Sequence, residues 1–354
     1  MKIREVQYRI VRLPLKQRFA IALGAQDYAE LVEVKVIGEE LEGYGEASPF
    51  SHVLGDSVET VAFALDSFRS EIVGMEVEDI RSIHEKMDKV LVRNESAKAA
   101  VDIALWDLLG KEAGLPTVKL LGSTRLAGDT DITIGIMGEE EARLRAIEYV
   151  RDGFKALKIK VGEDPERDAR RVKAIREAIG SDIQLRVDAN QGYSFAEAKE
   201  FLKKVSSADI EFLEQPLPEW ALDRTAELRL ESPFPIMLDE SVKSFRDMVE
   251  VVRRHAADMV NIKLMKSAGI SGGIPIAELA KEEDMKFMVG CMSESEVGIA
   301  AAMHFSLGLS ADYLDLDSHL NHSEVIADGF STKNGTNYLS GEPGFGVRVR
   351  SFER

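Results

Sequence analysis

The sequence predicts an α/β fold, a barrel of eight parallel strands that follows a segment of mixed strands and helices. Two observations support this prediction. From about Asp129 onward, short apolar runs alternate with charged segments of helical spacing, whereas the earlier part has a strand-like ribbon and then helices. One helix between successive strands makes neighbouring strands parallel, and eight of them in series favour a closed barrel. An open, doubly wound sheet is the alternative.

The chain begins with two stretches that are typical of strands. Residues 3–15 and 31–38 alternate polar and apolar side chains or are β-branched, which predicts an antiparallel ribbon joined by a polar loop around Gly24. The stretch GYGEASPF (43–50) has the glycines of a phosphate-binding loop but lacks its lysine. We therefore expect a turn at 43–50.

Three helices are expected after the ribbon, where apolar residues recur at helical spacing. They cover residues 58–68, 80–90 and 96–115. Serine is a common cap at helix N-termini, and glycine followed by proline is a common end. We therefore expect Ser96 to cap the last helix and Gly114 with Pro116 to close it.

Eight apolar runs are the candidate strands of the barrel. They cover residues 132–136, 156–161, 183–190, 211–216, 235–240, 259–264, 285–290 and 313–317. Amphipathic helical patterns lie between them and are clearest over 165–180, 194–205 and 273–284. Each step from one strand to the next is therefore predicted to be one strand–helix unit.

The charge balance argues against several classes of partner. Lys and Arg number 45 and Asp and Glu number 62, which gives a net charge of −17, and nucleic acids and anionic bilayers repel an acidic chain. No apolar stretch has the length of a membrane span. The single cysteine, Cys291, cannot form an intramolecular disulfide, and no signal-peptide pattern follows the first residues. We expect a cytoplasmic protein that binds neither nucleic acid nor membrane.

Acidic residues end three consecutive candidate strands, at Asp188, Glu214 and Asp239. In a parallel barrel the carboxyl ends of the strands meet at one mouth, where chemistry gathers. Three carboxylates in one mouth repel one another unless a cation joins them, and oxygen ligands favour Mg²⁺, with Mn²⁺ as the second choice. Each acid could instead only cap the helix that follows it, although three in succession make that alternative less favourable.

Two lysines flank these acids in the strand order, because Lys160 ends the second candidate strand and Lys263 the sixth. They would stand on nearly opposite sides of the mouth and reach one carbon atom from both faces. A divalent cation nearby disfavours the ammonium form, so it lowers the pKa of a lysine and makes the lysine a better base. The alternative is that each lysine only pairs with a carboxylate. Lys158 points the same way as Lys160 and could orient a carboxylate or tune its neighbour.

These motifs resemble the enolase superfamily, and within it the muconate-lactonizing-enzyme subgroup. The matching segments are LKIKVG, VDANQG, LEQPL, LDESV and NIKLMKSAGI, in the order of the family. The resemblance implies a (β/α)₇β modified TIM barrel, which lacks the eighth helix, and an α+β capping domain. It implies a capping domain at residues 1–125, a barrel at 126–320, and a tail at 321–354 that completes the cap.

The resemblance also implies the chemistry. Members of the superfamily use a lysine or histidine base with Mg²⁺ and pass through an ene-diolate. Asp188, Glu214 and Asp239 are thereby implied to bind the metal, and Lys160 and Lys263 to be the two bases. A proton removed from one face and returned to the other inverts the carbon, which makes the implied enzyme an isomerase, a racemase or epimerase.

The eighth candidate strand, YLDLDSHL, resembles the Asp-x-Asp motif of dipeptide epimerases, in which two aspartates hold the free ammonium of the dipeptide. Asp315 and Asp317 are thereby implied to bind substrate. The implied activity inverts the α-carbon of the second residue of an L-X–L-Y or L-X–D-Y dipeptide. The alternatives are o-succinylbenzoate synthase, N-succinylamino-acid racemase or muconate cycloisomerase activity, and more remotely a metal-binding barrel without catalysis.

Further residues are implied to surround the substrate. Relatives that act on L-Ala-Glu carry an arginine after the first cap strand, where this chain has Gly24, and Ser293 stands where a cation-specific member would have an acid. We therefore expect a neutral or hydrophobic second residue. The expected pocket residues are Gly24, Phe50, Val53, Lys158, Cys291, Met292 and Ser293, with Asn190 and Glu240 supporting the metal site. Members of the family commonly assemble, so a homo-oligomer is expected.

Overall fold

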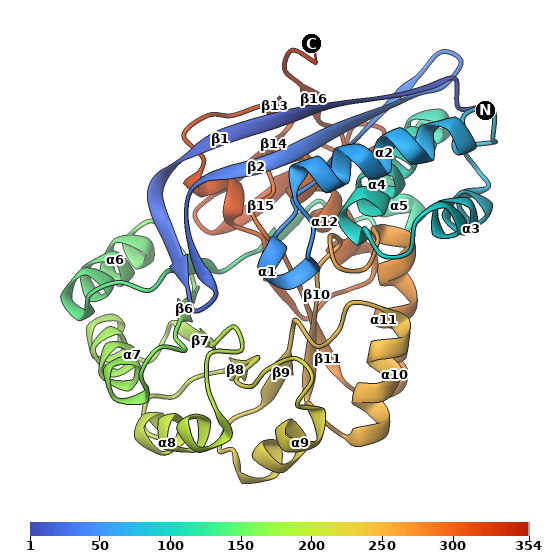
Figure 1. The fold of residues 1–354 in the computed structure, drawn as a ribbon. Coiled ribbons are helices and arrows are strands. Elements are labelled where there is room, and N and C mark those ends of the chain that lie inside the picture. Colours follow the sequence, from blue (N-terminus) through green and yellow to red (C-terminus); the bar gives the residue numbers. More distant parts are fainter. Residues whose placement is uncertain (353–354) are drawn as a thin grey trace.

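The computed structural model describes residues 1–352 and has a parallel barrel with a cap over one end (Figure 1). The barrel strands follow one another in sequence order around the sheet. They are β5 (Ile132–Ile134), β6 (Ala156–Lys160), β7 (Gln184–Asp188), β8 (Phe212–Glu214), β9 (Ile236–Leu238), β10 (Met259–Ile262), β11 (Lys286–Gly290) and β12 (Tyr313–Asp315). Every predicted strand is present, although most end one or two residues earlier than predicted, and the predicted barrel is confirmed.

One helix follows each of the first seven barrel strands and packs on the outside of the sheet (Figure 1). The helices are α6 (Glu139–Arg151), α7 (Pro165–Ile179), α8 (Phe195–Val205), α9 (Leu222–Glu231), α10 (Phe245–Arg254), α11 (Ile270–Glu282) and α12 (Glu296–Gly308). A short 3₁₀ turn, η1 (Ser318–Asn321), stands after β12 in the place of an eighth helix. The fold is therefore the (β/α)₇β form.

The first and last barrel strands meet at a seam with few backbone hydrogen bonds. The amide of Asp131 donates to the carbonyl of Leu314 at 3.2 Å. Side chains complete the closure, because Thr130 Oγ1 accepts from the amide of Leu316 at 2.9 Å and Asp317 Oδ2 accepts from the amide of Thr133 at 2.7 Å. Asp317 thus lies at the seam where the ring of helices is interrupted.

The cap is built on a long antiparallel ribbon, as the sequence predicts. It consists of β1 (Glu5–Ile21), β2 (Gly24–Ile37) and β3 (Glu42–Ala47). The predicted loop around Gly24 is wrong, because Ile21 pairs with Gly24 and only two residues form the turn. Gly24 has a φ of +148°, which a residue with a Cβ adopts with strain. The hairpin therefore extends as strand down to the barrel mouth.

Three helices pack on the ribbon and bury the apolar core of the cap, namely α2 (Val58–Ile72), α3 (Ile80–Val90) and α4 (Glu95–Ala113). Two short helices, α1 (Ser51–Leu54) and α5 (Thr117–Leu120), lie outside this core. α4 ends at Gly114 in the left-handed conformation, as predicted. The predicted cap at Ser96 is wrong, since Asn94 precedes the helix and the buried Ser96 hydroxyl donates to Asp56. Within residues 1–352, no helix is long and apolar enough to cross a bilayer.

The predicted turn over 43–50 is also wrong, because residues 42–47 form β3 in the middle of the cap–barrel contact. Two glycines allow it to lie directly on α4. A Cβ at Gly43 would stand 2.1 Å from the carbonyl oxygen of Ala104, and one at Gly45 would stand 2.0 Å from that of Ala100. The glycines are therefore needed for close approach rather than for a turn.

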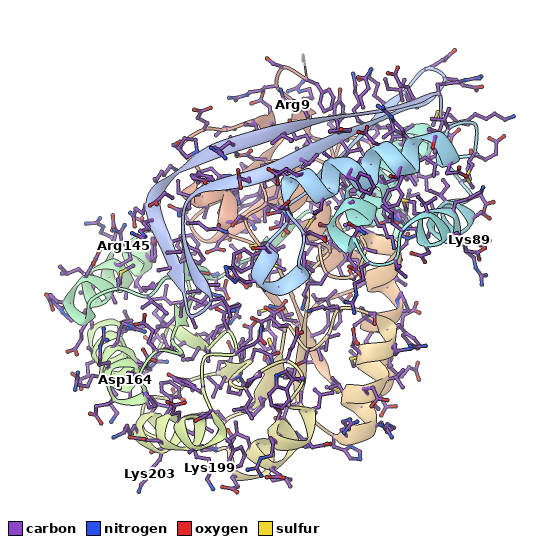
Figure 2. All side chains as sticks on the ribbon, viewed as in Figure 1. Arg9, Lys89, Arg145, Asp164, Lys199 and Lys203 are labelled. Carbon is purple, nitrogen blue, oxygen red and sulfur yellow. The ribbon has the colours of Figure 1, made fainter. Side chains whose placement is uncertain are left out.

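The tail of the chain returns to both parts of the molecule. The strand β4 (Ala127–Asp129) pairs with the hairpin β14 (Phe330–Lys333) and β15 (Thr336–Leu339), while β13 (Ala327–Asp328) pairs with β16 (Arg348–Val349). On the cap side, Asp107 accepts from the amide of Phe345 at 2.8 Å. Arg9, at the top of the ribbon in Figure 2, donates to the carbonyl of Arg350 at 3.2 Å.

We predict that Gly45→Ala destabilises the fold, because the added methyl group must move α4 away from β3. Overpacking of this kind costs about 1–3 kcal/mol in the free energy of unfolding. Gly138→Ala is the matched control, since a Cβ there meets nothing within 4 Å and its φ is −60°. Chemical denaturation of both variants checks the prediction, and equal stabilities would contradict it.

Candidate active site

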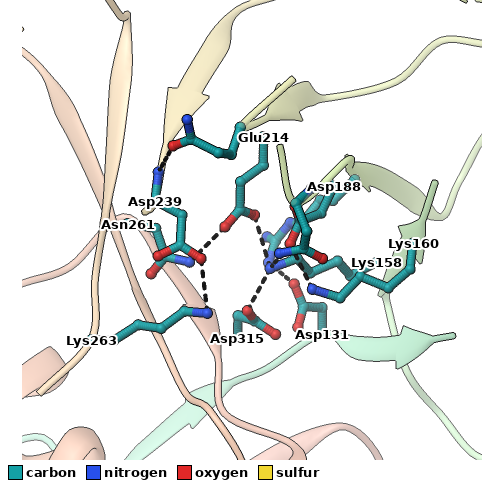
Figure 3. Close-up of polar contacts among 12 residues, drawn as sticks. Asp131, Lys158, Lys160, Asp188, Glu214, Asp239, Asn261, Lys263 and Asp315 are labelled. Carbon is teal, nitrogen blue, oxygen red and sulfur yellow. Dashed lines mark hydrogen bonds and ion pairs between the residues drawn. The ribbon is translucent and has the colours of Figure 1, made fainter. Parts of the chain in front are cut away.

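The carboxyl ends of neighbouring barrel strands bring five ionisable side chains to one mouth. Lys160, Asp188 and Glu214 are the last residues of β6, β7 and β8, while Asp239 follows β9 and Lys263 follows β10. The strand register places Lys160 opposite Asp188 and Asp188 opposite Glu214. Figure 3 shows these side chains pointing into the same space.

The three acids form a cluster that fits a divalent metal ion. One carboxylate oxygen from each of Asp188, Glu214 and Asp239 lies within 4.8 Å of the others, and all three side chains are buried. Burial and the nearby charge of Asp188 raise the pKa of Glu214 to about 7. Oε2 of Glu214 lies 2.8 Å from Lys158 Nζ. Such a buried set of three carboxylates offers only oxygen ligands, which suits Mg²⁺.

The two lysines approach this cluster from opposite sides. Lys160 Nζ donates to Asp188 Oδ2 at 2.6 Å, and Lys263 Nζ lies 2.8 Å from Asp239 Oδ2. Their strands, β6 and β10, are separated by three strands in the barrel. In Figure 3 the two side chains extend toward each other, with the acids between and behind them. A small molecule at the centre of the mouth would therefore have an amine on each side.

The carboxylate next to Lys263 decides its pKa in the protein chain itself, and the lowering by a divalent cation stays a prediction. Burial would lower its pKa, but the adjacent carboxylate of Asp239 outweighs burial and raises it. The same pairing lowers the pKa of Asp239. A metal ion bound to the carboxylate of Asp239 would weaken its pairing with Lys263. The basicity of Lys263 therefore depends on what Asp239 binds.

Lys158 lies at the bottom of the mouth and balances the acids. Its side chain has no solvent exposure, and its Nζ stands 2.7 Å from Asp315 Oδ2, 2.8 Å from Glu214 Oε2 and 3.1 Å from Asp188 Oδ2. Burial would lower the pKa of Lys158, but these carboxylates raise it well above its ordinary value. The contacts are those of a lysine that orients carboxylates, while its contact with substrate stays a prediction.

Two residues that contact the acid cluster were not predicted from the sequence. Lys266 is 1% exposed and donates to Asp239 Oδ1 and to the carbonyl of Asn261. Asn261 Nδ2 donates to Glu214 Oε1 at 2.8 Å. Asn261 could have been found from strand alternation, since it lies two residues before Lys263 and faces the same way. No pattern in the sequence distinguishes Lys266 from a surface lysine.

Asn190 and Glu240 lie beside the acid cluster. Asn190 Nδ2 donates to Glu240 Oε1 at 3.2 Å, and its own backbone amide donates to Asp188 Oδ1 at 2.9 Å. Burial, then the charges of Asp239 and Asp188, raise the pKa of Glu240 to about 8. Asn190 thus holds Asp188 by a hydrogen bond. The role of Asn190 and Glu240 in supporting a metal ion stays a prediction.

The two aspartates of the eighth strand lie in different surroundings. Asp315 ends β12 and faces Lys158, and the nearby lysines outweigh burial and lower its pKa to about 2. Asp317 lies beyond the strand, where burial and the charge of Asp315 raise its pKa to about 6. The thiol of Cys291 stands 3.9 Å from Asp317 Oδ1. The pair therefore offers negative charge at two depths of the mouth.

A small cavity of about 60 Å³, which we name the inner compartment, lies between the cap and the acid cluster. Most of the predicted pocket residues line it together. Its wall contains Gly24, Phe50, Val53, Lys160, Asn190, Asp239, Glu240, Lys263, Cys291, Met292 and Ser293. Phe19 and Ile21 of β1 add apolar surface that the sequence analysis did not identify.

A second cavity of about 580 Å³, the outer compartment, adjoins the first on the side of the barrel seam. Asp315 and Asp317 line the outer compartment, while Lys263 and Asp239 line the inner one. The two share five wall residues, which are Phe19, Lys160, Cys291, Met292 and Ser293. They are therefore two parts of one site that meet at Lys160.

Comparisons with known proteins agree with this geometry. Residues 3–122 match the family "Mandelate racemase / muconate lactonizing enzyme, N-terminal domain", and residues 141–353 match "Enolase C-terminal domain-like". The chain is 38% identical to an L-Ala-D/L-Glu epimerase of Clostridium acetobutylicum, over 98% of this chain and 99% of that one. It is 39% identical to a hydrophobic dipeptide epimerase of Enterococcus faecalis, over 86% and 87%.

A solved structure gives the same result. A dipeptide epimerase of Enterococcus faecalis V583, in complex with Mg and the dipeptide L-Leu-L-Tyr, superposes with a TM-score of 0.96 at 36% identity and covers 98% of this chain and 99% of that one. Both halves of the chain, its fold and its mouth motifs thus lead to one assignment. The chain belongs to the mandelate racemase and muconate lactonizing enzyme family of the enolase superfamily.

Proposed function

We propose that the protein is a Mg²⁺-dependent dipeptide epimerase, which inverts the α-carbon of the second residue of a dipeptide. One observation carries the proposal. The acid cluster lies between two lysines that approach from opposite sides, and a pair of aspartates lies at one end of the same site. The epimerase relatives support the dipeptide as the substrate class.

The metal site of this proposal consists of Asp188, Glu214 and Asp239. Magnesium bound there would neutralise the substrate carboxylate and so make the adjacent carbon more acidic. Lys266 and Asn261 hold Asp239 and Glu214 from behind, while Lys158 balances the remaining charge. Mn²⁺ in place of Mg²⁺ stays a prediction.

The proton transfer is assigned to Lys160 and Lys263. One nitrogen takes the α-proton from one face of the substrate, and the other returns a proton to the opposite face, so the configuration inverts. Both side chains are more than 90% buried, so little water surrounds the reacting carbon. Either lysine can begin the reaction, depending on whether the second residue is L or D.

Asp315 and Asp317 would hold the substrate ammonium in the outer compartment. This assignment separates the proposal from its alternatives, because N-succinylamino acids, o-succinylbenzoate precursors and muconate have no ammonium for the aspartates to bind. The second residue of the dipeptide would lie in the inner compartment, whose apolar residues Phe19, Phe50 and Val53 favour a neutral or hydrophobic side chain. A homo-oligomer, a cytoplasmic location and the domain limits at residues 125 and 320 also stay predictions.

We predict that Glu214→Gln abolishes tight Mg²⁺ binding, because it removes one charged ligand from the cluster. The loss of an outer-shell partner already weakens metal affinity by about 10–100-fold, so we expect a larger loss here. Glu211→Gln is the matched control. Glu211 lies three residues before Glu214 and pairs with Arg186 instead of the acid cluster. Titration calorimetry at constant pH measures both, and an unchanged affinity in Glu214→Gln would remove the metal site from the proposal.

We predict that Lys160→Met and Lys263→Met each lose epimerisation by at least about 10²–10⁴-fold, which is the contribution of one acid–base group. In D₂O, one variant is expected to exchange the α-proton of only the L-L dipeptide and the other that of only the L-D dipeptide. Proton NMR on both diastereomers measures this. The exposed Lys203→Met is the control. Loss of the same exchange in both variants would refute two bases on opposite faces.

We predict that L-Ala-L-Leu and L-Ala-L-Phe react at least about tenfold faster in kcat/KM than L-Ala-L-Glu and L-Ala-L-Lys, because an apolar compartment strips water from a charge without pairing it. Ser293→Asp is expected to increase the relative rate of L-Ala-L-Lys, whereas Ser293→Ala should leave the ranking unchanged. Steady-state kinetics on the four dipeptides decides the question. A dominant rate with L-Ala-L-Glu would overturn the expected preference.

A further inference from the structure

The two compartments of the site differ greatly in size. The inner compartment holds about 60 Å³ and the outer one about 580 Å³. The inner compartment lies beneath the cap, between β1, α1 and the ends of the central strands. The outer compartment lies along the seam between β5 and β12, where no helix follows the last strand. Space for the substrate is therefore distributed unequally around Lys160.

The orientation of a dipeptide in the site follows from the charges of the two walls. Asp239 and Lys263 line the inner compartment, so Mg²⁺ bound at the acids would hold the substrate carboxylate on that side. Asp315 and Asp317, which would receive the ammonium, line the outer one. A dipeptide held at both ends therefore places its first side chain beside the outer compartment.

We propose that the outer compartment binds a bulky, uncharged side chain on the first residue of the dipeptide, so that the preferred substrates begin with an aromatic or long aliphatic L-amino acid. This inference rests on the proposed function and adds its substrate class. A compartment nearly ten times larger than its neighbour leaves most of its volume unfilled by an alanine methyl group. Each additional methylene group that is removed from water favours binding, so the compartment favours the larger side chain.

The wall of the outer compartment has the chemistry that this side chain needs. Tyr149 and Phe154 form an edge-to-face pair with ring centroids 6.0 Å apart, and Met137 and Leu320 add aliphatic surface. Aromatic rings in this arrangement offer a face and an edge to a third apolar group. The wall thus provides apolar contact beyond the two aspartates.

The same wall carries charges of both signs, because Lys16, Arg18 and Arg145 line it together with Glu148 and Asp152. Arg145, on the outer side of α6 in Figure 2, lies 3.3 Å from Glu148 and its guanidinium carbon lies 5.8 Å from the ring centre of Tyr149. His322 also lines the compartment and is 2% exposed, and burial lowers its pKa to about 4, so it adds no charge at neutral pH. A charged first side chain would find no dominant opposite charge apart from the ammonium site.

A dipeptide series on the wild-type protein with Mg²⁺ tests the inference. The second residue is kept as L-Leu, and the first is Ala, Leu, Phe, Lys or Glu. We expect kcat/KM for L-Phe-L-Leu and L-Leu-L-Leu to exceed that for L-Ala-L-Leu by at least about tenfold, and the Lys and Glu dipeptides to lie below L-Phe-L-Leu. A preference for Ala, Lys or Glu in the first position would overturn the proposal.

A matched pair of variants locates the effect. Met137→Trp fills part of the outer compartment and is expected to lower the ratio of the L-Phe-L-Leu rate to the L-Ala-L-Leu rate by about tenfold. Leu144→Trp adds the same ring on the surface of α6, where Leu144 is 54% exposed, and should leave this ratio unchanged. An unchanged ratio in Met137→Trp would show that the first side chain lies elsewhere.

Binding separates this inference from the proposed function. If no dipeptide exchanges its α-proton, the epimerase proposal fails, and titration calorimetry of the Mg²⁺-loaded protein then decides on the compartment. Tighter binding of L-Phe-L-Leu than of L-Ala-L-Leu would still support a bulky first residue. Equal or weaker binding would overturn it.

Discussion

The mutual repulsion of buried carboxylates is the constraint on which the site depends. Asp188, Glu214 and Asp239 are brought within 4.8 Å of one another by three adjacent strand ends, with essentially no solvent to screen them. Such an arrangement is strongly unfavourable unless positive charge is placed among the acids. Lys158 and Lys266 place their amines against the acids at the bottom and the back of the mouth. The centre of the mouth is left for an ion and a substrate.

The cap and the seam divide the mouth into two environments. The hairpin of β1 and β2 and the short helix α1 close the metal side with apolar side chains. The opposite side opens where the chain turns at η1 instead of forming an eighth helix. One barrel can thus hold the reacting carbon in a tight, dry space while it gives the rest of the substrate room. Such a division lets substrate preference vary without a change in the lysines or acids.

The strand ends could be predicted because their spacing follows from the repeated strand–helix unit. Acids and lysines recur once per unit, and a closed barrel must bring them to one mouth. The local errors have physical causes. Gly43 and Gly45 were attributed to a turn, but their task is close contact with α4, which only the folded chain reveals. Lys266 could not be identified from the sequence because its partner, Asp239, is 27 positions away.

The contacts of the tail make the order of synthesis matter. Asp107 of the cap accepts a hydrogen bond from Phe345, and Arg9 donates one to Arg350, so the cap makes contacts with residues more than two hundred positions later in the chain. When only the barrel strands have left the ribosome, the tail residues that stabilise the cap are therefore still missing. Pairings of such long range slow folding and prolong the exposure of apolar surface. The contacts between the cap and the tail therefore form only after residues 345–350 have left the ribosome.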